Sequence, residues 1–345
     1  MSPSQCARLK YIAINNLEFP TTDKFNIWQN NRMEDNLFFK VRISTLIPDK
    51  PTTFDLYLKV GEQNILYLRA GDTLEKSKIH SLGQKDAGQH FLVRETDRKF
   101  YKTYVHSQMT SDKIDPKQKA MILRDSSMTL MEELFEHPDV SVALENSRPI
   151  VKDFIQFMKA EPDAMAHLIS LSGHDFYTYN HSLDVAVYSL GLAEAMGFQK
   201  EELEEMGLGA LFHDIGKRQV SLDILTKKGP LDDAEWSQMQ KHPQYGLVIL
   251  NEQKVTDAVK AACFEHHESW IGNGYPQQIS GNEIHPFARI VAITDTYDAM
   301  TTQRSYNVPL KPLDAVTMMK EKLAGRYDPE MLKAMYSVLF RLKVA

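Results

Sequence analysis

Three side chains able to bind metal or phosphate occur within the segment 211–217, which reads Leu-Phe-His-Asp-Ile-Gly-Lys. An adjacent histidine and aspartate can bind two different metal ions, with the carboxylate of Asp214 bridging them. Lys217 lies four residues after His213, so the two share a face if the helix continues, whereas Asp214 is rotated by about 100°. Taken alone, the pair favours a structural role, in which a buried His213 bonds to its neighbour and Gly216 stops the helix.

A second cluster is the pair His266-His267, flanked by Glu265 and Glu268 at the end of an apolar helical segment. Two consecutive imidazoles are costly to bury without polar partners. The two glutamates either orient the imidazoles through hydrogen bonds or are solvated. The sequence leaves both roles open.

Further residues of the metal-ligand type occur on other predicted helices. His181 opens one helix, His242 precedes a proline at the end of another, and Asp295 interrupts an apolar run. Such recurrence on separate helices is what a helical bundle with a metal site in its core requires. Six of the twelve histidines fall between positions 181 and 285, and we predict that the sixth, His285, is a helix-entry residue.

This set of nitrogen and oxygen donors predicts two divalent metal ions, since each ion needs roughly five or six donors including water. Imidazole with carboxylate suits iron, manganese, zinc, cobalt or nickel, and disfavours calcium, which prefers oxygen alone. We expect iron or manganese. The two cysteines, Cys6 and Cys263, are too few for a thiolate zinc site or a disulfide framework, so we expect reduced thiols.

The composition is that of a soluble globular protein of about two domains, with 345 residues, 43% hydrophobic residues and a net charge of −6. No run approaches 18 apolar residues, and the N-terminus lacks a signal-peptide pattern. We therefore expect a cytoplasmic protein without a membrane span. Residues 151–345 carry 19 basic and 26 acidic residues, which argues against DNA or RNA as a partner. An anionic substrate would need local cations there.

The elements before position 115 predict a small α+β domain. Strands are expected at 38–47, 54–60, 64–70 and 90–96, with a polar helix at Thr73–Leu82. The segment 1–115 contains no glycine-rich phosphate loop and no metal-spaced histidines. We assign it a regulatory or sensory role with an unknown ligand.

After position 115 the hydrophobic period changes from two to 3.6, which predicts helices. Residues 116–172 would form a helical linker or bundle extension able to pair two chains, and residues 173–345 an all-α bundle. Thr256 and Asp328 are expected helix N-caps, and Pro312 and Pro329 suit first turns. The predicted helices are 130–138, 150–162, 164–173, 181–196, 200–213, 232–240, 256–267, 286–302, 312–324 and 328–342.

At this point the motifs match a known family. The motif His213-Asp214-x-Gly216-Lys217, followed by His266-His267-Glu268-x-Trp-x-Gly272-x-Gly274-Tyr275-Pro276, resembles the HD-GYP domain. That domain is a branch of the HD phosphohydrolase superfamily and hydrolyses the bacterial messenger cyclic di-GMP. The resemblance extends from about Asp175 to Asp328, so it covers the second half of the chain.

The resemblance implies roles for individual residues. Asp214 would bridge two ions, Lys217 and Arg304 would contact the substrate's phosphates, and the loop from Gly272 to Pro276 would lie beside the substrate. In that loop, Gly274, Tyr275 and Pro276 are the expected substrate contacts. The implied metal ligands are His181, His213, Asp214, His242, His266, His267 and Asp295.

The implied reaction is hydrolysis of the 3′,5′-phosphodiester. A hydroxide between two ions about 3.5–4 Å apart is a nucleophile at neutral pH, and the ions neutralise the phosphate oxygens. Asp214 and Lys217 are the expected catalytic residues, with Lys217 stabilising the charge of the transition state. The products would be linear pGpG and, after a second cut, GMP.

Three positions depart from the family pattern. Family members thought to hold a third metal have a glutamate where this chain has Tyr177, so we predict two ions. Ile271 replaces an aspartate before the first glycine of the loop, and Asn307 replaces a basic residue. The last two changes would weaken substrate affinity or slow turnover.

Three other charged residues lie near these motifs in the sequence. Asp184 lies one turn after His181, and Asp298 lies one turn after Asp295. Each of the two aspartates either reaches the site or has a role away from it, which for Asp184 would be on the surface. Arg289 is expected to form an ion pair.

Two other functions stay open. One is a receptor for cyclic di-GMP, or for partner signalling domains, with little turnover. The other is a phosphodiesterase for a different cyclic dinucleotide. A homodimer is a further expectation.

Overall fold

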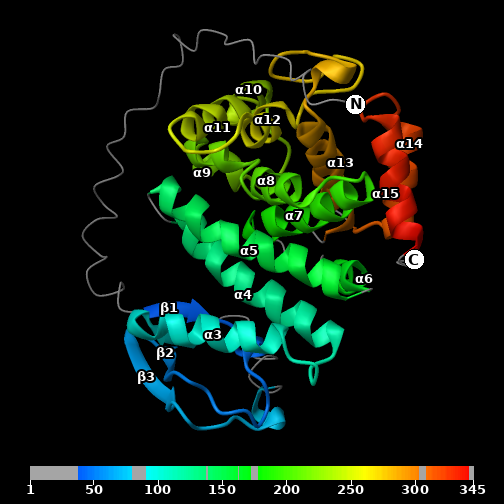
Figure 1. Cartoon of the computed structure of the whole chain (residues 1–345). Helices are drawn as coiled ribbons and strands as arrows, with labels where there is room; N and C mark the ends of the chain where they lie inside the picture. Colours follow the sequence, from blue (N-terminus) through cyan, green and yellow to red (C-terminus); the bar gives the residue numbers. More distant parts are fainter. Residues whose placement is uncertain are drawn as a thin grey trace. The chain divides into compact units, whose positions relative to one another are not determined.

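The computed structural model describes residues 38–79, 91–136, 139–161, 163–171, 178–302 and 308–341. The chain folds into two compact units, with the division between Leu130 and Met131. Figure 1 labels helices and strands of each unit. The first contains a small antiparallel sheet and the second is mostly helical, which confirms the predicted fold class.

The sheet of the first unit has four strands in the order β1-β4-β2-β3. All its pairs are antiparallel, and β2 and β3 form a hairpin in which Val60 lies opposite Gln63. Gly61, in the connecting turn, has a φ of 60°, a conformation that favours glycine. The strands are β1 (Phe38–Val41), β2 (Leu56–Val60), β3 (Gln63–Leu68) and β4 (Phe91–Arg94).

One helix that was not predicted from the sequence packs against this sheet. Helix α3 (Arg98–Met109) buries Tyr101 and Tyr104 in the same apolar core as Phe39 and Phe54. The two tyrosines are three residues apart, a helical spacing that falls within a polar segment. Of the predicted helix at 73–82, residues 76–79 are helical and residues 80–82 lie outside the described part.

Helix α4 (Pro116–Glu136) contains the division between the two units. The second unit continues with α5 (Val140–Ala160) and α6 (Ala164–Leu171) and then a bundle of helices. Its further elements are α7 (Thr178–Ala195), α8 (Lys200–Leu211), η4 (Ile215–Gln219), α9 (Leu222–Leu225), α10 (Asp233–Met239), α11 (His242–Asn251), α12 (Asp257–Glu265), η5 (Gly281–Glu283), α13 (Pro286–Thr301), α14 (Pro312–Lys322) and α15 (Pro329–Arg341).

The bundle is built around α7, α8, α12 and α13. Helix α7 packs against α8 and α13, and α12 packs against α8, α11 and α13. Their facing sides are lined by fully buried apolar side chains such as Leu190, Phe212 and Ile290. The interior of this bundle therefore receives side chains from several helices at once.

Most helix boundaries agree with the sequence predictions, and the predicted caps are present. The hydroxyl of Thr256 accepts from the amide of Val259, and Asp328 accepts from the amides of Glu330 and Met331. The prediction omitted α9 and α11. In the described part of the chain, no helix is both long and apolar enough to cross a membrane.

Candidate metal centre

Asp214 lies in the turn between α8 and the 3-10 helix η4, next to His213. The helix does not continue through this segment, so the helical face expected for His213 and Lys217 does not form. Instead η4 packs directly on the first turn of α11. A Cβ on Gly216 would lie 1.9 Å from the carbonyl oxygen of His242, so only glycine permits this approach. Gly216 is therefore a close-packing position that brings His242 to Asp214.

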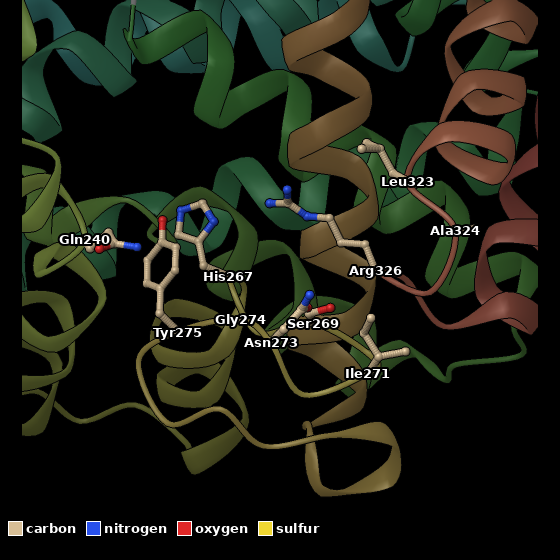
Figure 2. Close-up of a pocket in the computed structure, with 10 residues that line it drawn as sticks. All are labelled: Gln240, His267, Ser269, Ile271, Asn273, Gly274, Tyr275, Leu323, Ala324 and Arg326. Carbon is tan, nitrogen blue, oxygen red and sulfur yellow. The ribbon is translucent and has the colours of Figure 1, made fainter. Parts of the chain in front are cut away.

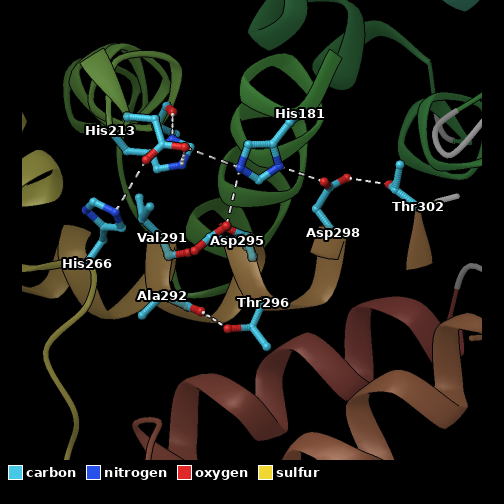
Figure 3. A network of polar contacts seen from close by, with 12 residues as sticks. His181, His213, His266, Val291, Ala292, Asp295, Thr296, Asp298 and Thr302 are labelled. Carbon is cyan, nitrogen blue, oxygen red and sulfur yellow. Dashed lines mark hydrogen bonds and ion pairs between the residues drawn. The ribbon is translucent and has the colours of Figure 1, made fainter. Parts of the chain in front are cut away.

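The structure brings all seven predicted ligands together inside the bundle. They come from the start of α7, the turn after α8, the start of α11, the end of α12 and the middle of α13. Figure 3 labels His181, His213, His266 and Asp295 of this set. His213, His242 and His266 are at most 1% exposed. The seven residues are His181, His213, Asp214, His242, His266, His267 and Asp295.

The two carboxylate oxygens of Asp214 face different histidines. Oδ2 lies 3.3 Å from Nε2 of His213 and 3.7 Å from Nε2 of His181. Oδ1 lies 3.2 Å from Nε2 of His242 and 3.9 Å from Nε2 of His266. Asp214 therefore stands between two pairs of imidazoles.

The remaining two ligands complete two groups of three. Asp295 joins the first pair, with its Oδ1 3.3 Å from Nε2 of His181, and His267 joins the second. Within each group the ligand atoms lie within 4.8 Å of one another. This arrangement offers two ion positions that share Asp214. The groups are His181, His213 and Asp295, and His242, His266 and His267. A third group, His213, Asp214 and His266, joins one histidine of each to Asp214.

Three of the imidazoles are oriented by carbonyl groups at the ends of α8, α10 and α12. Nδ1 of His213, His242 and His266 lies 2.7 to 2.8 Å from the carbonyl oxygen three residues earlier in the chain. The last carbonyls of a helix lack intrahelical partners, so these rings satisfy them. A carbonyl only accepts, so Nδ1 carries the proton and Nε2 presents its lone pair to Asp214.

The fourth imidazole has a carboxylate partner. Nδ1 of His181 donates to Oδ2 of Asp298 over 2.7 Å, and Thr302 donates to the other oxygen of Asp298 over 2.9 Å (Figure 3). Asp298 is fully buried and thus orients His181, one of the two roles that the sequence left open. Asp184 is 1% exposed, so its surface role was wrong. Thr302 was missed.

This donor set fits metal ions. Nε2 of His242 and Nε2 of His266 lie 3.3 Å apart, although their tethered Nδ1 atoms leave both as acceptors. Nε2 of His213 and Oδ1 of Asp214 are buried without a hydrogen-bond partner. Bare acceptors facing each other in a buried site repel unless a cation lies between them.

For His266, His267 and Asp214 the protonation states agree with this requirement. Burial and the neighbouring histidines lower the pKa of His266 well below its usual value, and burial lowers the pKa of His267 to about 3. Burial opposes ionisation of Asp214, but Lys217 and the nearby histidines outweigh it and lower its pKa. His181 is the exception: burial lowers its pKa, but the hydrogen bonds and charges of Asp295 and Asp298 outweigh burial and raise the pKa to about 10, so this ring must lose a proton to bind a metal ion.

The predicted phosphate-binding residues lie partly at this site. The ammonium group of Lys217 donates to Oδ2 of Asp214, so it stands at the edge of the ligand cluster. Arg304, Tyr177 and Asn307 lie outside the described residues.

The glycine loop is packed against the second group of ligands. Tyr275 stacks on His267 with ring centroids 4.8 Å apart, and its amide donates to the carbonyl of His267. A Cβ on Gly274 would lie 2.5 Å from that carbonyl oxygen. Gly272 has the positive φ expected of it, at 80°. Tyr275 and Gly274 line a pocket, whereas Pro276 is not among the lining residues.

Neither predicted role of Glu265 and Glu268 is correct. Both are buried, and each accepts a backbone hydrogen bond, from His285 and Gln277 respectively. They fix the two ends of the loop rather than an imidazole. His285 is the N-cap of α13, as predicted.

A pocket of about 390 Å³ opens beside His267 (Figure 2). Most of its wall was not anticipated from the sequence, because it combines the glycine loop with the connection between α14 and α15. The described lining residues are Gln240, His267, Ser269, Ile271, Asn273, Gly274, Tyr275, Leu323, Ala324 and Arg326.

Comparison with known families agrees with this geometry. The family model of the HD domain matches residues 163–331, which contain all seven ligands. Residues 163–331 are an HD domain. The family predicted from the motifs is therefore confirmed.

Two curated relatives of this HD domain are bacterial phosphodiesterases. A cyclic di-GMP phosphodiesterase of Pseudomonas aeruginosa is 36% identical over 174 residues, which are 50% of this chain and 42% of the relative. The 3′3′-cGAMP-specific phosphodiesterase 3 of Vibrio cholerae is 37% identical over 164 residues, 47% of this chain and 35% of the relative. The chain thus spans less than half the length of these relatives.

A solved structure shares the fold over most of the chain. It is an HDG"Y"P protein from Bdellovibrio bacteriovorus, with a TM-score of 0.69 and 22% identity. The match covers 88% of this chain and 99% of that protein. The HD domain and its preceding residues therefore have a known structural precedent.

Proposed function

We propose that this chain is a metal-dependent phosphodiesterase that hydrolyses cyclic di-GMP. The observation that carries the proposal is the division of six ligands into two groups on either side of Asp214. A carboxylate shared by two ions is the arrangement that two-metal phosphodiester hydrolysis requires.

The two ions are iron or manganese in this proposal, with zinc, cobalt or nickel as alternatives, because imidazole and carboxylate suit these metals. When bound, they would activate water and neutralise charge on the phosphate. Asp214 would hold both ions, and the tethered Nδ1 atoms would keep each Nε2 directed at its ion.

Lys217 and Arg304 would contact the substrate's phosphate groups. The ammonium of Lys217 already lies at the edge of the ligand cluster, where it would stabilise the charge of the transition state. Bound metal ions would supply local positive charge, which would offset the acidic balance of this half for an anionic substrate. The products would be pGpG and GMP.

The named relatives support a cyclic dinucleotide as substrate, since both hydrolyse one. Similarity to the cGAMP-specific phosphodiesterase of Vibrio cholerae favours 3′3′-cGAMP as the second candidate substrate. A receptor with little turnover is the remaining alternative, because Ile271 and Asn307 replace polar or basic residues of the family pattern.

We also propose that residues 1–115 regulate the catalytic domain at 173–345 through the helices at 116–172. Pairing of two chains and contacts with other cyclic di-GMP signalling domains belong to this proposal, as does a cytoplasmic location. The measurable consequence of the proposed regulation is a change in turnover when residues 1–115 are removed.

The test is hydrolysis by purified protein loaded anaerobically with Fe²⁺ or with Mn²⁺. Cyclic di-GMP and 3′3′-cGAMP are supplied separately, and linear products are separated by chromatography. We expect pGpG from cyclic di-GMP, and neither product nor bound metal with Asp214→Ala. Metal-loaded protein that forms no product from either substrate would contradict an enzymatic function and favour the receptor.

A further inference from the structure

One guanidinium group projects into the pocket beside the candidate metal centre. Figure 2 shows the side chain of Arg326 extending across the pocket towards His267 and Tyr275. His267 belongs both to the pocket wall and to a ligand group, so the pocket adjoins one proposed ion position. At about 390 Å³ it is at the small end for ligand sites, which suits one nucleoside rather than a whole dinucleotide.

The backbone around Arg326 is fixed by the glycine loop. The carbonyl oxygen of Arg326 accepts from the amide of Trp270 over 2.9 Å, and that of Gly325 accepts from Ile271 over 3.1 Å. Gly325 has a φ of 85°, which turns the chain at this point. The α14–α15 connection is thus paired with the loop that carries Tyr275.

A second contact holds this connection in place. Arg289 on α13 forms an ion pair with Asp328 over 2.8 Å, as predicted, and its guanidinium lies over the ring of Trp270. Asp328 is the N-cap of α15, two residues after Arg326. Arg326 therefore projects from a backbone that is tethered on both sides.

The side chain of Arg326 is available for a ligand. It is exposed, its guanidinium lies 5.9 Å from the ring centroid of Tyr327, and no ion pair joins it to a carboxylate in the described part of the chain. Its backbone carbonyl, rather than its guanidinium, makes the contact that holds the loop. Replacing the side chain should therefore leave the loop in place.

The wall of the pocket suits a flat base that carries hydrogen-bond acceptors. Tyr275 offers an aromatic surface, while Gln240 and Asn273 offer neutral amides. Ser269 adds a hydroxyl that is buried without a partner. Among the described lining residues none is a carboxylate, and Arg326 is the one with a permanent charge.

We propose that Arg326 recognises a guanine base of the substrate. The planar guanidinium can donate two hydrogen bonds to O6 and N7 of guanine, whereas adenine presents a donor in place of O6. The base would lie in the pocket beside His267 while its phosphate lies at the metal centre. This proposal rests on the proposed function and specifies its substrate as a dinucleotide with at least one guanine.

The test compares guanine and adenine ligands on three variants of the full chain. Arg326→Ala removes the guanidinium, Arg326→Lys keeps the charge but not the planar pair of donors, and Lys322→Ala is a control that removes a charge from the end of α14, beside the same connection. Dissociation constants are measured on metal-loaded protein with the hydrolysis-resistant phosphorothioate analogues of cyclic di-GMP and cyclic di-AMP. Thermal unfolding verifies that each variant is folded.

We expect Arg326→Ala to weaken binding of the cyclic di-GMP analogue by about 5- to 150-fold, the worth of a bidentate contact to guanine. Arg326→Lys should show a similar loss, and the cyclic di-AMP analogue should bind all variants about equally. Equal binding of cyclic di-GMP by wild type and Arg326→Ala would overturn the proposal. The proposal would also be overturned if Arg326→Ala weakened binding of both analogues equally and Arg326→Lys bound both as tightly as wild type. That pattern would identify a contact to phosphate rather than to guanine.

Hydrolysis of bis(p-nitrophenyl) phosphate separates this proposal from the proposed function, because that phosphodiester has no base. Wild-type protein and the control Lys322→Ala should hydrolyse it at the same rate. A wild-type protein that hydrolyses no phosphodiester would contradict the proposed function, while the binding comparison would still decide the role of Arg326. A wild-type protein that binds neither analogue would overturn both.

Discussion

Nδ1 of His181 donates a hydrogen bond to Oδ2 of Asp298 across 2.7 Å, and Asp298 has no exposed surface. Asp295 lies one helical turn before Asp298 on the same face of α13, and its Oδ1 lies 3.3 Å from the other nitrogen of His181. One helix therefore provides both a ligand and the group that orients a neighbouring ligand.

The first prediction concerns this pair. Asp298→Ala should lower metal affinity about 10- to 100-fold at the ion position of His181, because partners of ligand histidines typically contribute that much. Thr302→Val, which removes a hydrogen bond to Asp298 and leaves the carboxylate in place, should have a smaller effect. The measurement is competition with a chelator, followed for each of the two ions. Equal weakening of both ions would show that Asp298 acts on the whole fold instead.

The second prediction concerns the contact between η4 and α11. Gly216→Ala would place a methyl group 1.9 Å from the carbonyl oxygen of His242, and 2.4 Å from the amide nitrogen of Gly246. Backbone atoms cannot move aside cheaply, so unfolding should become easier by about 3 kcal/mol, the upper part of the range for overpacking. Metal affinity should fall as well, since His242 moves away from Asp214.

The matched control for this substitution is Gly191→Ala. Its methyl group would meet the flexible end of Met165, which can rotate away. Denaturant unfolding compares the two variants. The account of Gly216 as a close-packing position is wrong if both substitutions change the free energy of unfolding by the same amount.

The third prediction concerns stability at acid pH. Burial, followed by the charge of Arg289, lowers the pKa of His285 to about 4, whereas an unfolded histidine titrates near 6.5. The folded state thus binds fewer protons than the unfolded state between these values. His285 should cost the protein stability progressively as the pH falls from 6.5 to 4, by up to about 3 kcal/mol.

His285→Asn tests this linkage, because asparagine can still cap α13 through its side-chain oxygen. The difference in unfolding free energy between variant and wild type should move in favour of the variant as the pH falls. Burial raises the pKa of Glu265 to about 7, so Glu265 contributes to stability with the opposite dependence on pH. Both proteins contain Glu265, and its contribution therefore cancels in the difference. A difference that does not vary between pH 6.5 and 4 would show that His285 is not the titrating group.

The positions of the candidate ligands could be predicted because each one is a polar residue within or beside an apolar segment. Some of these residues lie at the end of a helix and others lie within one. His213, His242 and His266 follow the last turns of α8, α10 and α12, and each bonds to the carbonyl three residues before it. The shared spacing follows from helix geometry. The helices and most of their caps could be predicted for the same reason.

The sequence was less informative where a role depends on distant parts of the chain. Glu265 and Glu268 stand beside the ligand histidines, yet they accept from amides of a loop that returns 9 to 20 residues later. Arg326 lies in no recognisable motif, and reaches the pocket through backbone pairing with Trp270. Helix α3 was missed because the large side chains that it buries are two tyrosines in an otherwise mostly polar segment.

The central claim is that Asp214 joins two metal ions in one site, and the most direct test is the metal content of anaerobically purified protein. Elemental analysis against protein concentration should give two ions per chain, and none for folded Asp214→Ala. One ion per chain in the saturated wild type would contradict the shared carboxylate. Three ions would contradict the two-ion prediction drawn from Tyr177, and two ions retained by Asp214→Ala would show that Asp214 is not their bridge.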